Sequence, residues 1–345
     1  MFYSNIFNYI KRYGDIPFEE KEFNEIDNTI LSLLSYLDFS NISYNTLEIV
    51  GKEYLNKYKL KEISKYGFSA KDAYKVLSKI INKNRFKKII IEDYEYNNKN
   101  MQFKAITFRI NKKLKYISFS GTDQYIDSWR ESFYLLSSFL VPAHYEAIKY
   151  VNKHIKLFGP KVIIGGHSKG GNLALISGIY TNYLKKYKIK NIYNNDGPGL
   201  RVEEFNSKKY QKIKKKYIQI IPHNSIYGVS LINEKHYVIK SKKISFLSHS
   251  ISSWCVKGDR FISTNLSKKH EKLEHKLHNW IDNHPEEERK KIVDTIFDTI
   301  EKCEIEDIMN LKKFKNIVKV IKELKQIDEE SKELAINFIV SILKV

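Results

Sequence analysis

The sequence predicts a protein of the α/β class, in which a mostly parallel central sheet is flanked by helices, with helical additions at both ends of the chain. Strand-like runs alternate with helical patterns through the middle of the chain, which is typical of βαβ units and a parallel sheet. One run, residues 161–164, meets a glycine-rich turn and continues into an apolar helical pattern. Both ends of the chain carry apolar residues at helical spacing.

The glycine-rich turn is the most informative stretch. It reads Gly166-His167-Ser168-Lys169-Gly170 and fits the nucleophile elbow, in which a serine sits on a strained turn between strand and helix. Because a helix begins after the serine, its free amide and positive end face an oxyanion formed there. A βα turn without catalysis could match five residues by chance, but the required strand and helix are both present. The motif therefore favours an α/β-hydrolase fold and acyl chemistry at Ser168.

Length and composition are those of one packed domain. The chain has 345 residues, of which 42% are hydrophobic and 13% aromatic, which is too apolar for disorder. Cys255 and Cys303 lie far apart and form neither a metal pattern nor a disulfide framework, so we expect small buried apolar groups in a reducing compartment. We expect a single α/β-hydrolase-like domain over residues 1–345.

The net charge is +20, and no apolar run has the length of a membrane span. The first residues resemble no cleaved leader, so we expect a cytoplasmic protein. A positive field attracts phosphates and anionic lipid, and peripheral contact with an anionic membrane is compatible with it. The lysines are spread over the chain, however, and base composition of the genome explains them more simply. Nucleic-acid binding is not expected, because no recognised motif accompanies the charge.

The N-terminal segment, residues 1–85, is predicted to be helical. Apolar positions recur at helical spacing in residues 23–37, 44–58 and 69–82, with Asn24 as a cap of the first helix. The last helix is expected to open at Ser69, with Asp72 three residues on.

The catalytic core is predicted to span residues 86–265 and to begin with three strands. The expected strands are residues 87–93, 103–110 and 115–120, with a turn at 111–113. The third strand leads into Gly121-Thr122-Asp123 before a helix. Since the second oxyanion donor of this fold comes from the loop after the third strand, we expect the amide of Thr122 or Asp123 to join that of Lys169. An ordinary turn that caps the next helix is the alternative.

The rest of the core alternates helices and strands. Helices are expected at residues 142–157 and 172–184, and strands at 190–194, 217–222 and 237–241. The C-terminal segment, residues 266–345, is predicted to be helical and strongly charged, with Pro285 marking a helix start.

A serine nucleophile needs a base, and that base needs an acid to hold its tautomer. In this fold the chain order is serine, acid, histidine, each on a loop at the same sheet edge. His249 follows the last strand of the core, and Asp196 is the only aspartate between it and Ser168. Weaker alternatives for the acid are Glu203, Glu204 and Glu234. His167 and Lys169 are expected only to line the elbow.

Neither a metal nor another cofactor is predicted. No cluster of histidine, cysteine and carboxylate has the spacing of metal ligands, and no phosphate-binding loop occurs.

With these residues placed, the chain resembles a bacterial family, the Mbeg-like proteins or domain of unknown function 2974, which is similar to class 3 lipases. The likeness covers most of the chain. It includes the stretches 23–27, 103–108, 121–123 with Trp129, 166–174, 194–199, 225–228 and His249 with Trp254.

The resemblance implies an α/β-hydrolase fold and a serine hydrolase of the esterase or lipase type, acting on a small-molecule or lipid ester. The chain departs from the family where charged residues are common, with Ser120, Ser132 and Ser250 in their place. A non-catalytic binding protein for a lipid or protein partner is the alternative function.

Overall fold

A seven-stranded sheet forms the centre of the protein. The computed structural model describes residues 3–97, 101–123, 125–137, 140–305, 307, 310, 314–323, 328–329 and 332–333. The strands stand in chain order, with β1 to β3 antiparallel and β3 to β7 parallel. They are β1 (Ile90–Asn97), β2 (Phe103–Asn111), β3 (Leu114–Phe119), β4 (Lys161–His167), β5 (Ile189–Asn195), β6 (Tyr217–Pro222) and β7 (His236–Ile239).

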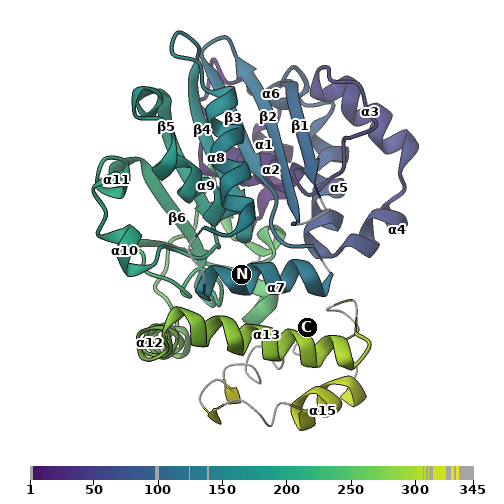
Figure 1. Ribbon diagram of the computed structural model, residues 1–345. Helices are drawn as coiled ribbons and strands as arrows, with labels where there is room; N and C mark the ends of the chain where they lie inside the picture. The colour runs from purple at the N-terminus through teal and green to yellow at the C-terminus, as the bar shows by residue number, and fades with distance from the viewer. Residues whose placement is uncertain are drawn as a thin grey trace.

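This sheet, flanked by helices on both faces, has the α/β-hydrolase fold that the sequence predicts (Figure 1). The second and third predicted strands are confirmed as the hairpin β2–β3, and β6 has the predicted bounds. The first predicted strand was placed too early. Residues 84–87 form the short helix α6 (Asn84–Lys87), which buries the side chains of Arg85 and Phe86. The strand β1 therefore begins only at Ile90.

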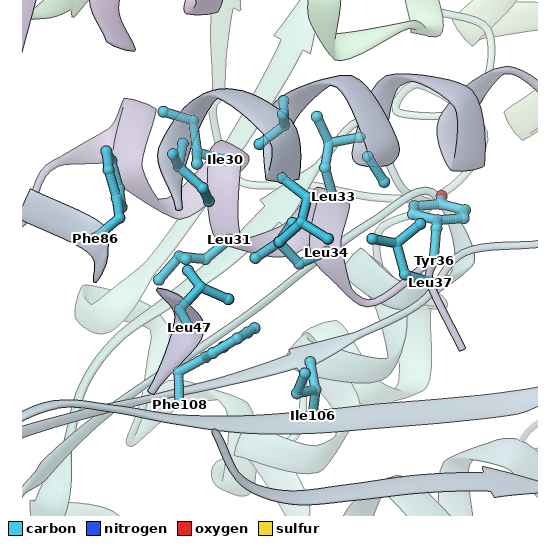
Figure 2. Close-up of a cluster of buried hydrophobic side chains, with 14 of the residues drawn as sticks. Ile30, Leu31, Leu33, Leu34, Tyr36, Leu37, Leu47, Phe86, Ile106 and Phe108 are labelled. Carbon is cyan, nitrogen blue, oxygen red and sulfur yellow. The ribbon is translucent and has the colours of Figure 1, made fainter. Parts of the chain in front are cut away.

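The N-terminal helices cover one face of the sheet. They are α1 (Ile6–Tyr13), α2 (Glu25–Leu34), α3 (Leu47–Lys57), α4 (Leu60–Ile63) and α5 (Phe68–Ile80). Leucine and isoleucine side chains of α2 pack over Ile106 and Phe108 of β2 (Figure 2). Asn24 caps α2 as predicted, since its side chain accepts the amides of Ile26 and Asp27. The prediction that Ser69 opens α5 is wrong, because the helix begins at Phe68 with Gly67 at the cap.

The opposite face is covered by α8 (Pro142–His154) and α9 (Lys169–Tyr180). Along β4, Ile163 packs towards α2, whereas Val162 and Ile164 pack towards α8 and α9. Both faces of the parallel strands are therefore buried, which is why β4 reads as a continuous apolar run. The helix α9 begins three residues before the predicted start, directly after Ser168, and ends four residues before the predicted end.

A buried histidine joins the two helices on this face. His144 of α8 is 4% exposed and its Nε2 lies 2.7 Å from Oδ1 of Asn172 in α9. Burial lowers the pKa of His144 to about 4, because the charged imidazolium loses its solvation. The folded protein therefore binds a proton at this ring only well below the pH at which an unfolded chain does.

We expect this histidine to make the protein less stable in acid. The unfolded ring takes up its proton near pH 6.5 and the folded ring near 4, so stability is fully present above 6.5 and is lost as pH falls. The loss from this group is about 1.4 kcal/mol per pH unit between the two pKa values and ends below the lower one, where both states carry the proton. Urea unfolding across this range should show a shallower pH dependence for His144→Gln than for the wild type. His275→Gln, an exposed control on α12 (Lys268–Asn283), should leave the dependence unchanged.

The C-terminal helices lie over the carboxyl end of the parallel strands. The helix α7 (Ile126–Ser137) crosses that end, and α13 (Glu286–Lys302) packs along its outer side (Figure 1). A third hydrophobic cluster joins them through Trp129, Phe297 and their neighbours. The remaining helices of this segment are α12 (Lys268–Asn283) and α15 (Phe314–Glu323). Pro285 caps α13 as predicted, whereas much of the predicted helical segment beyond residue 305 lies outside the described residues.

Two further expectations concern the whole chain. Cys255 and Cys303 are both buried, as predicted. Within the described residues, every helix is too short or too polar to cross a membrane.

Candidate active site

Ser168 lies between the last residue of β4 and the first residue of α9. Its φ is 59° and its ψ is −131°, a left-handed conformation that side chains other than glycine rarely adopt. The turn is crowded, since a Cβ built on Gly166 would lie 2.2 Å from the carbonyl oxygen of Gly170, and one on Gly170 would lie 2.1 Å from that of Phe119. The two glycines of the motif are thus required by close packing of strand and helix.

The structure brings Asp196 and His249 together. Asp196 directly follows β5 with a φ of 54°, and His249 ends the 3-10 helix η4 (Ser245–His249) after β7. Nδ1 of His249 donates to Oδ2 of Asp196 at 2.6 Å, while Oδ1 accepts the hydroxyl of Ser225. The alternative acids take other partners. Glu203 pairs with Arg201, Glu234 pairs with Lys214, and Glu204 is buried on α10 (Val202–Phe205).

Burial shapes the protonation of this pair. Asp196 is fully buried and His249 is partly buried. Loss of solvation raises the pKa of Asp196 and lowers the pKa of His249, and the hydrogen bond from Ser225 partly opposes the shift at Asp196. A neutral imidazole that donates from Nδ1 leaves its Nε2 as a proton acceptor. The Ser168 hydroxyl itself makes no hydrogen bond with any residue that the structure describes.

His167 has a larger role than lining the elbow. Its ring lies against that of His249, with centroids 4.2 Å apart, and its Nε2 donates to the carbonyl oxygen of His249 at 2.9 Å. The hydroxyl of Tyr36 lies 2.7 Å from Nδ1 on the other side of the ring. Burial, and secondly the neighbouring His249, lower the pKa of His167 to about 3. The ring is therefore neutral at pH 7, and its Nδ1 accepts the hydroxyl proton of Tyr36. The ring of Tyr227 covers His249 at 4.4 Å.

The loop after β3 lies beside Ser168. A Cβ built on Gly121 would lie 2.9 Å from Cβ of Ser168 and 2.1 Å from the hydroxyl oxygen of Tyr36. In this loop the Thr122 hydroxyl lies 2.5 Å from that of Ser132 on α7, and Asp123 accepts the amide of Tyr125. The amide of Lys169 stands at the first position of α9, where it has no acceptor within the helix.

The side chain of Lys169 is buried away from the serine. Its Nζ donates to Oε2 of Glu131 on α7 at 2.7 Å and to the carbonyl oxygen of Gln102 at 2.6 Å. Gln102 in turn donates from its side chain to the carbonyl oxygen of Gly121 at 3.1 Å. Lys169 therefore ties the elbow to α7 and to the loop after β3. No local pattern predicts a role for Tyr36 or Gln102, because their partners are 131 and 19 residues away.

Side-chain hydrogen bonds hold the segments that contain Ser120, Ser132 and Ser250. Ser250 donates to Asp72 of α5 at 2.8 Å, and Trp254 donates from its indole to the carbonyl oxygen of Ser248 at 2.9 Å. Ser132 contacts Thr122, and Ser120 donates to the carbonyl oxygen of Gly121. The bond from Ser250 to the Asp72 carboxylate thus anchors the His249 segment, and bonds between uncharged groups anchor the loop after β3.

The other downstream histidines lie elsewhere. His236 contacts Gln219 and Glu274, and His270 contacts Ser267. His284, the residue after α12, contacts the carbonyl oxygen of Trp280. Among the described residues, no three His, Cys, Asp or Glu side chains are grouped so that they could hold a metal ion.

Comparison with known proteins gives one family. The model of the Mbeg1-like family matches residues 80–298, and a search of curated proteins finds no match. Among solved structures, the chain is similar to the crystal structure of M37 lipase, with 12% identity over 60% of this chain and 70% of that chain and a TM-score of 0.37. The matched residues contain the elbow, Asp196, His249 and the loop after β3. The chain belongs to the Mbeg1-like family.

Proposed function

We propose that this protein is a serine hydrolase that cleaves an acyl ester, with Ser168 as nucleophile, His249 as base and Asp196 as the acid that orients the base. The observation that carries the proposal is the 2.6 Å hydrogen bond from His249 to Asp196, next to a serine held on a left-handed turn. Such a turn lifts a serine hydroxyl clear of the sheet, where a substrate carbonyl can approach it.

In the first half of the reaction, Oγ of Ser168 attacks the carbonyl carbon while Nε2 of His249 takes the hydroxyl proton. The imidazolium that forms is stabilised by Asp196, whose buried carboxylate lies against Nδ1. Collapse of the intermediate expels the alcohol, which receives the proton from His249. Water then repeats the sequence on the acyl-enzyme and releases the acid.

The oxyanion is proposed to bind the amide of Lys169 together with that of Thr122 or Asp123. Lys169 supplies the amide at the positive end of α9, and Gly121 brings the other loop to within contact of Ser168. The ion pair of Lys169 with Glu131 supports this role, because it fixes the two donor segments to each other before substrate arrives.

The substrate class that fits is a small-molecule or lipid ester. The ring of Tyr227 and the Trp129 behind it offer an apolar wall on one side of His249. Comparing hydrolysis of acetate and long-chain esters will assign the preferred acyl length.

Labelling with a fluorophosphonate probe tests the proposal. We expect the folded protein to be labelled at Ser168, as located by mass spectrometry of the peptide, and Ser168→Ala to remain unlabelled. Heat-denatured protein is the control, since an isolated serine hydroxyl does not react. If the folded wild type also stays unlabelled, the hydrolase proposal fails and a non-catalytic binding protein of the same fold takes its place.

A further inference from the structure

A lysine-rich surface lies at the end of the sheet where the parallel strands begin, which is the end opposite Ser168. It is made of residues 111–113, 152–161, 180–190 and 205–217, and we name these four segments the amino-edge surface. They contain 15 lysines and no aspartate or glutamate. The lysines are Lys112, Lys113, Lys153, Lys156, Lys161, Lys185, Lys186, Lys188, Lys190, Lys208, Lys209, Lys212, Lys214, Lys215 and Lys216.

Hydrogen bonds join the segments into one surface. The hydroxyl of Tyr187 donates to the carbonyl oxygen of Leu157 at 2.5 Å, and Nζ of Lys188 donates to that of Gly159 at 2.7 Å. Lys216 donates to the carbonyl oxygen of Lys186 at 2.8 Å, and the amide of Lys161 donates to that of Lys113 at 3.0 Å. The strands β3 to β6 begin here, and the turn at 111–113 lies at the far end of the sheet from α7 and α13 (Figure 1).

The lysines of this surface fall into two groups. Several have structural partners: Lys185, Lys186, Lys188 and Lys216 bind backbone carbonyls, and Lys153, Lys190 and Lys214 pair with acids outside the four segments. Others, such as Lys156, Lys212 and Lys215, are exposed and have no ion pair among the residues that the structure describes. This second group leaves positive charge that no ion pair among the described residues neutralises.

The lysines of this surface lie close enough together to repel one another, and the pKa values of two of them are lowered in part for this reason. Burial first, and then the neighbouring Lys212 and Lys209, lower the pKa of Lys186. The pKa of Lys216 is lowered first by burial and second by the positive charge of Lys161. The lysines therefore stand close enough to disfavour one another's charge, which an anionic partner would relieve.

Large apolar side chains protrude from the same surface. Phe158 is 102% exposed, Tyr183 69% and Leu184 62%, and Leu157 and Tyr187 are also exposed. They come from only two segments, which the bond between Tyr187 and Leu157 holds side by side. Exposed apolar groups gathered in this way mark a contact site.

We propose that the amino-edge surface docks on a bilayer that contains anionic lipid. The unpaired lysines match acidic head groups, and Phe158 and Leu184 can enter the interface between head groups and acyl chains. A bilayer accounts for both features, whereas a nucleic acid would use the charge but leave aliphatic Leu157 and Leu184 without a role. Since β4 runs about 20 Å from Lys161 to His167, docking leaves the candidate active site facing away from the membrane. The proposal is thus independent of the hydrolase function.

Vesicle sedimentation tests the proposal. The full chain is mixed with vesicles of equimolar phosphatidylglycerol and phosphatidylcholine, or with phosphatidylcholine alone, at low and raised salt. We expect binding only to the anionic vesicles, and weaker binding as salt screens the lysines. The triple variant Lys156→Glu, Lys212→Glu, Lys215→Glu should lower the partition coefficient by about 100-fold or more. Phe158→Ser with Leu184→Ser should lower it by about 10-fold or more, because both side chains lose a place in the interface.

Two matched controls separate this surface from the overall charge. The first control is a triple variant that removes the same charge from exposed positions in the N-terminal segment, namely Lys61→Glu, Lys65→Glu, Lys71→Glu. The second is a double variant that removes exposed apolar groups elsewhere, Ile49→Ser with Ile244→Ser. Both should bind nearly as the wild type does. Equal losses in the two lysine triples would overturn the proposal in favour of unspecific charge. Full vesicle binding by the Phe158 and Leu184 variant, with displacement by single-stranded RNA, would overturn it in favour of a nucleic-acid partner.

Discussion

Replacing Ser168 or His249 by alanine is expected to lower kcat for a p-nitrophenyl ester by about 10⁶-fold. The double variant should lose little more than either single variant, because a nucleophile and its base act as one unit. The reason lies in the site: the hydroxyl of Ser168 is inert at neutral pH without a base, and His249 is the imidazole that Asp196 holds at 2.6 Å. Ester hydrolysis followed by released nitrophenolate measures the effect.

The acid should be less critical than the other two residues. Asp196→Asn is expected to lower kcat by about 10⁴-fold and so to retain more activity than Ser168→Ala. Circular dichroism and urea unfolding serve as controls that each variant is folded. Additive losses in the double variant would show that Ser168 and His249 do not act together. Wild-type activity in Asp196→Asn would reassign the acid to Glu203, Glu204 or Glu234.

Replacing Arg85 by alanine is expected to lower the free energy of unfolding by about 3–5 kcal/mol. Arg85 and Asp27 are both fully buried, with Nη2 to Oδ2 at 2.5 Å and Nε to Oδ1 at 2.8 Å. Arg85 also donates to the carbonyl oxygens of residues 16, 21 and 22, and its guanidinium lies 4.1 Å above the ring of Phe18. Its removal strands a buried carboxylate at the start of α2, along with those carbonyls.

An exposed ion pair provides the comparison for this effect. Lys52 and Glu48 lie one turn apart on α3, with side chains 54% and 37% exposed. Lys52→Ala should change stability by less than about 0.5 kcal/mol, since water screens the pair. Urea unfolding of both variants at neutral pH gives the two values. A loss below about 1 kcal/mol in Arg85→Ala would mean that water reaches Asp27 when the guanidinium is absent.

The connection of α2 to the site makes Arg85 relevant to function. Asn28 of α2 donates to the side chain of Asn195 at 2.8 Å, next to Asp196, and Tyr36 just beyond the helix contacts His167. A shifted α2 would therefore disturb both the acid and the ring that lies against His249. The N-terminal segment supports the proposed active site as well as covering the sheet.

The sequence by itself determined the features that depend on local pattern. Glycines at 166 and 170 around a serine predicted the elbow, because only close packing of a strand against the next helix demands them there. Chain order selected Asp196 and His249, since parallel strands bring the loops that follow them to one edge. Asn24 and Pro285 predicted helix starts for different local reasons. The side chain of Asn24 accepts two amides of the first turn of α2, whereas the ring of Pro285 holds the backbone in a conformation that leads into α13.

Only the tertiary structure decided which distant groups meet. Lys169 stands next to the serine in sequence, yet its ammonium is buried against Glu131, a residue 38 positions earlier. His167 was expected to line the elbow, but Tyr36 and the His249 carbonyl hold its ring from segments 131 and 82 residues away. The lysines are spread over the whole chain in the sequence, and the fold gathers those of four separate segments at one end of the sheet. Periodicity and spacing report on neighbours within a few residues, whereas these contacts exist only after the strands have paired and the helices have packed on them.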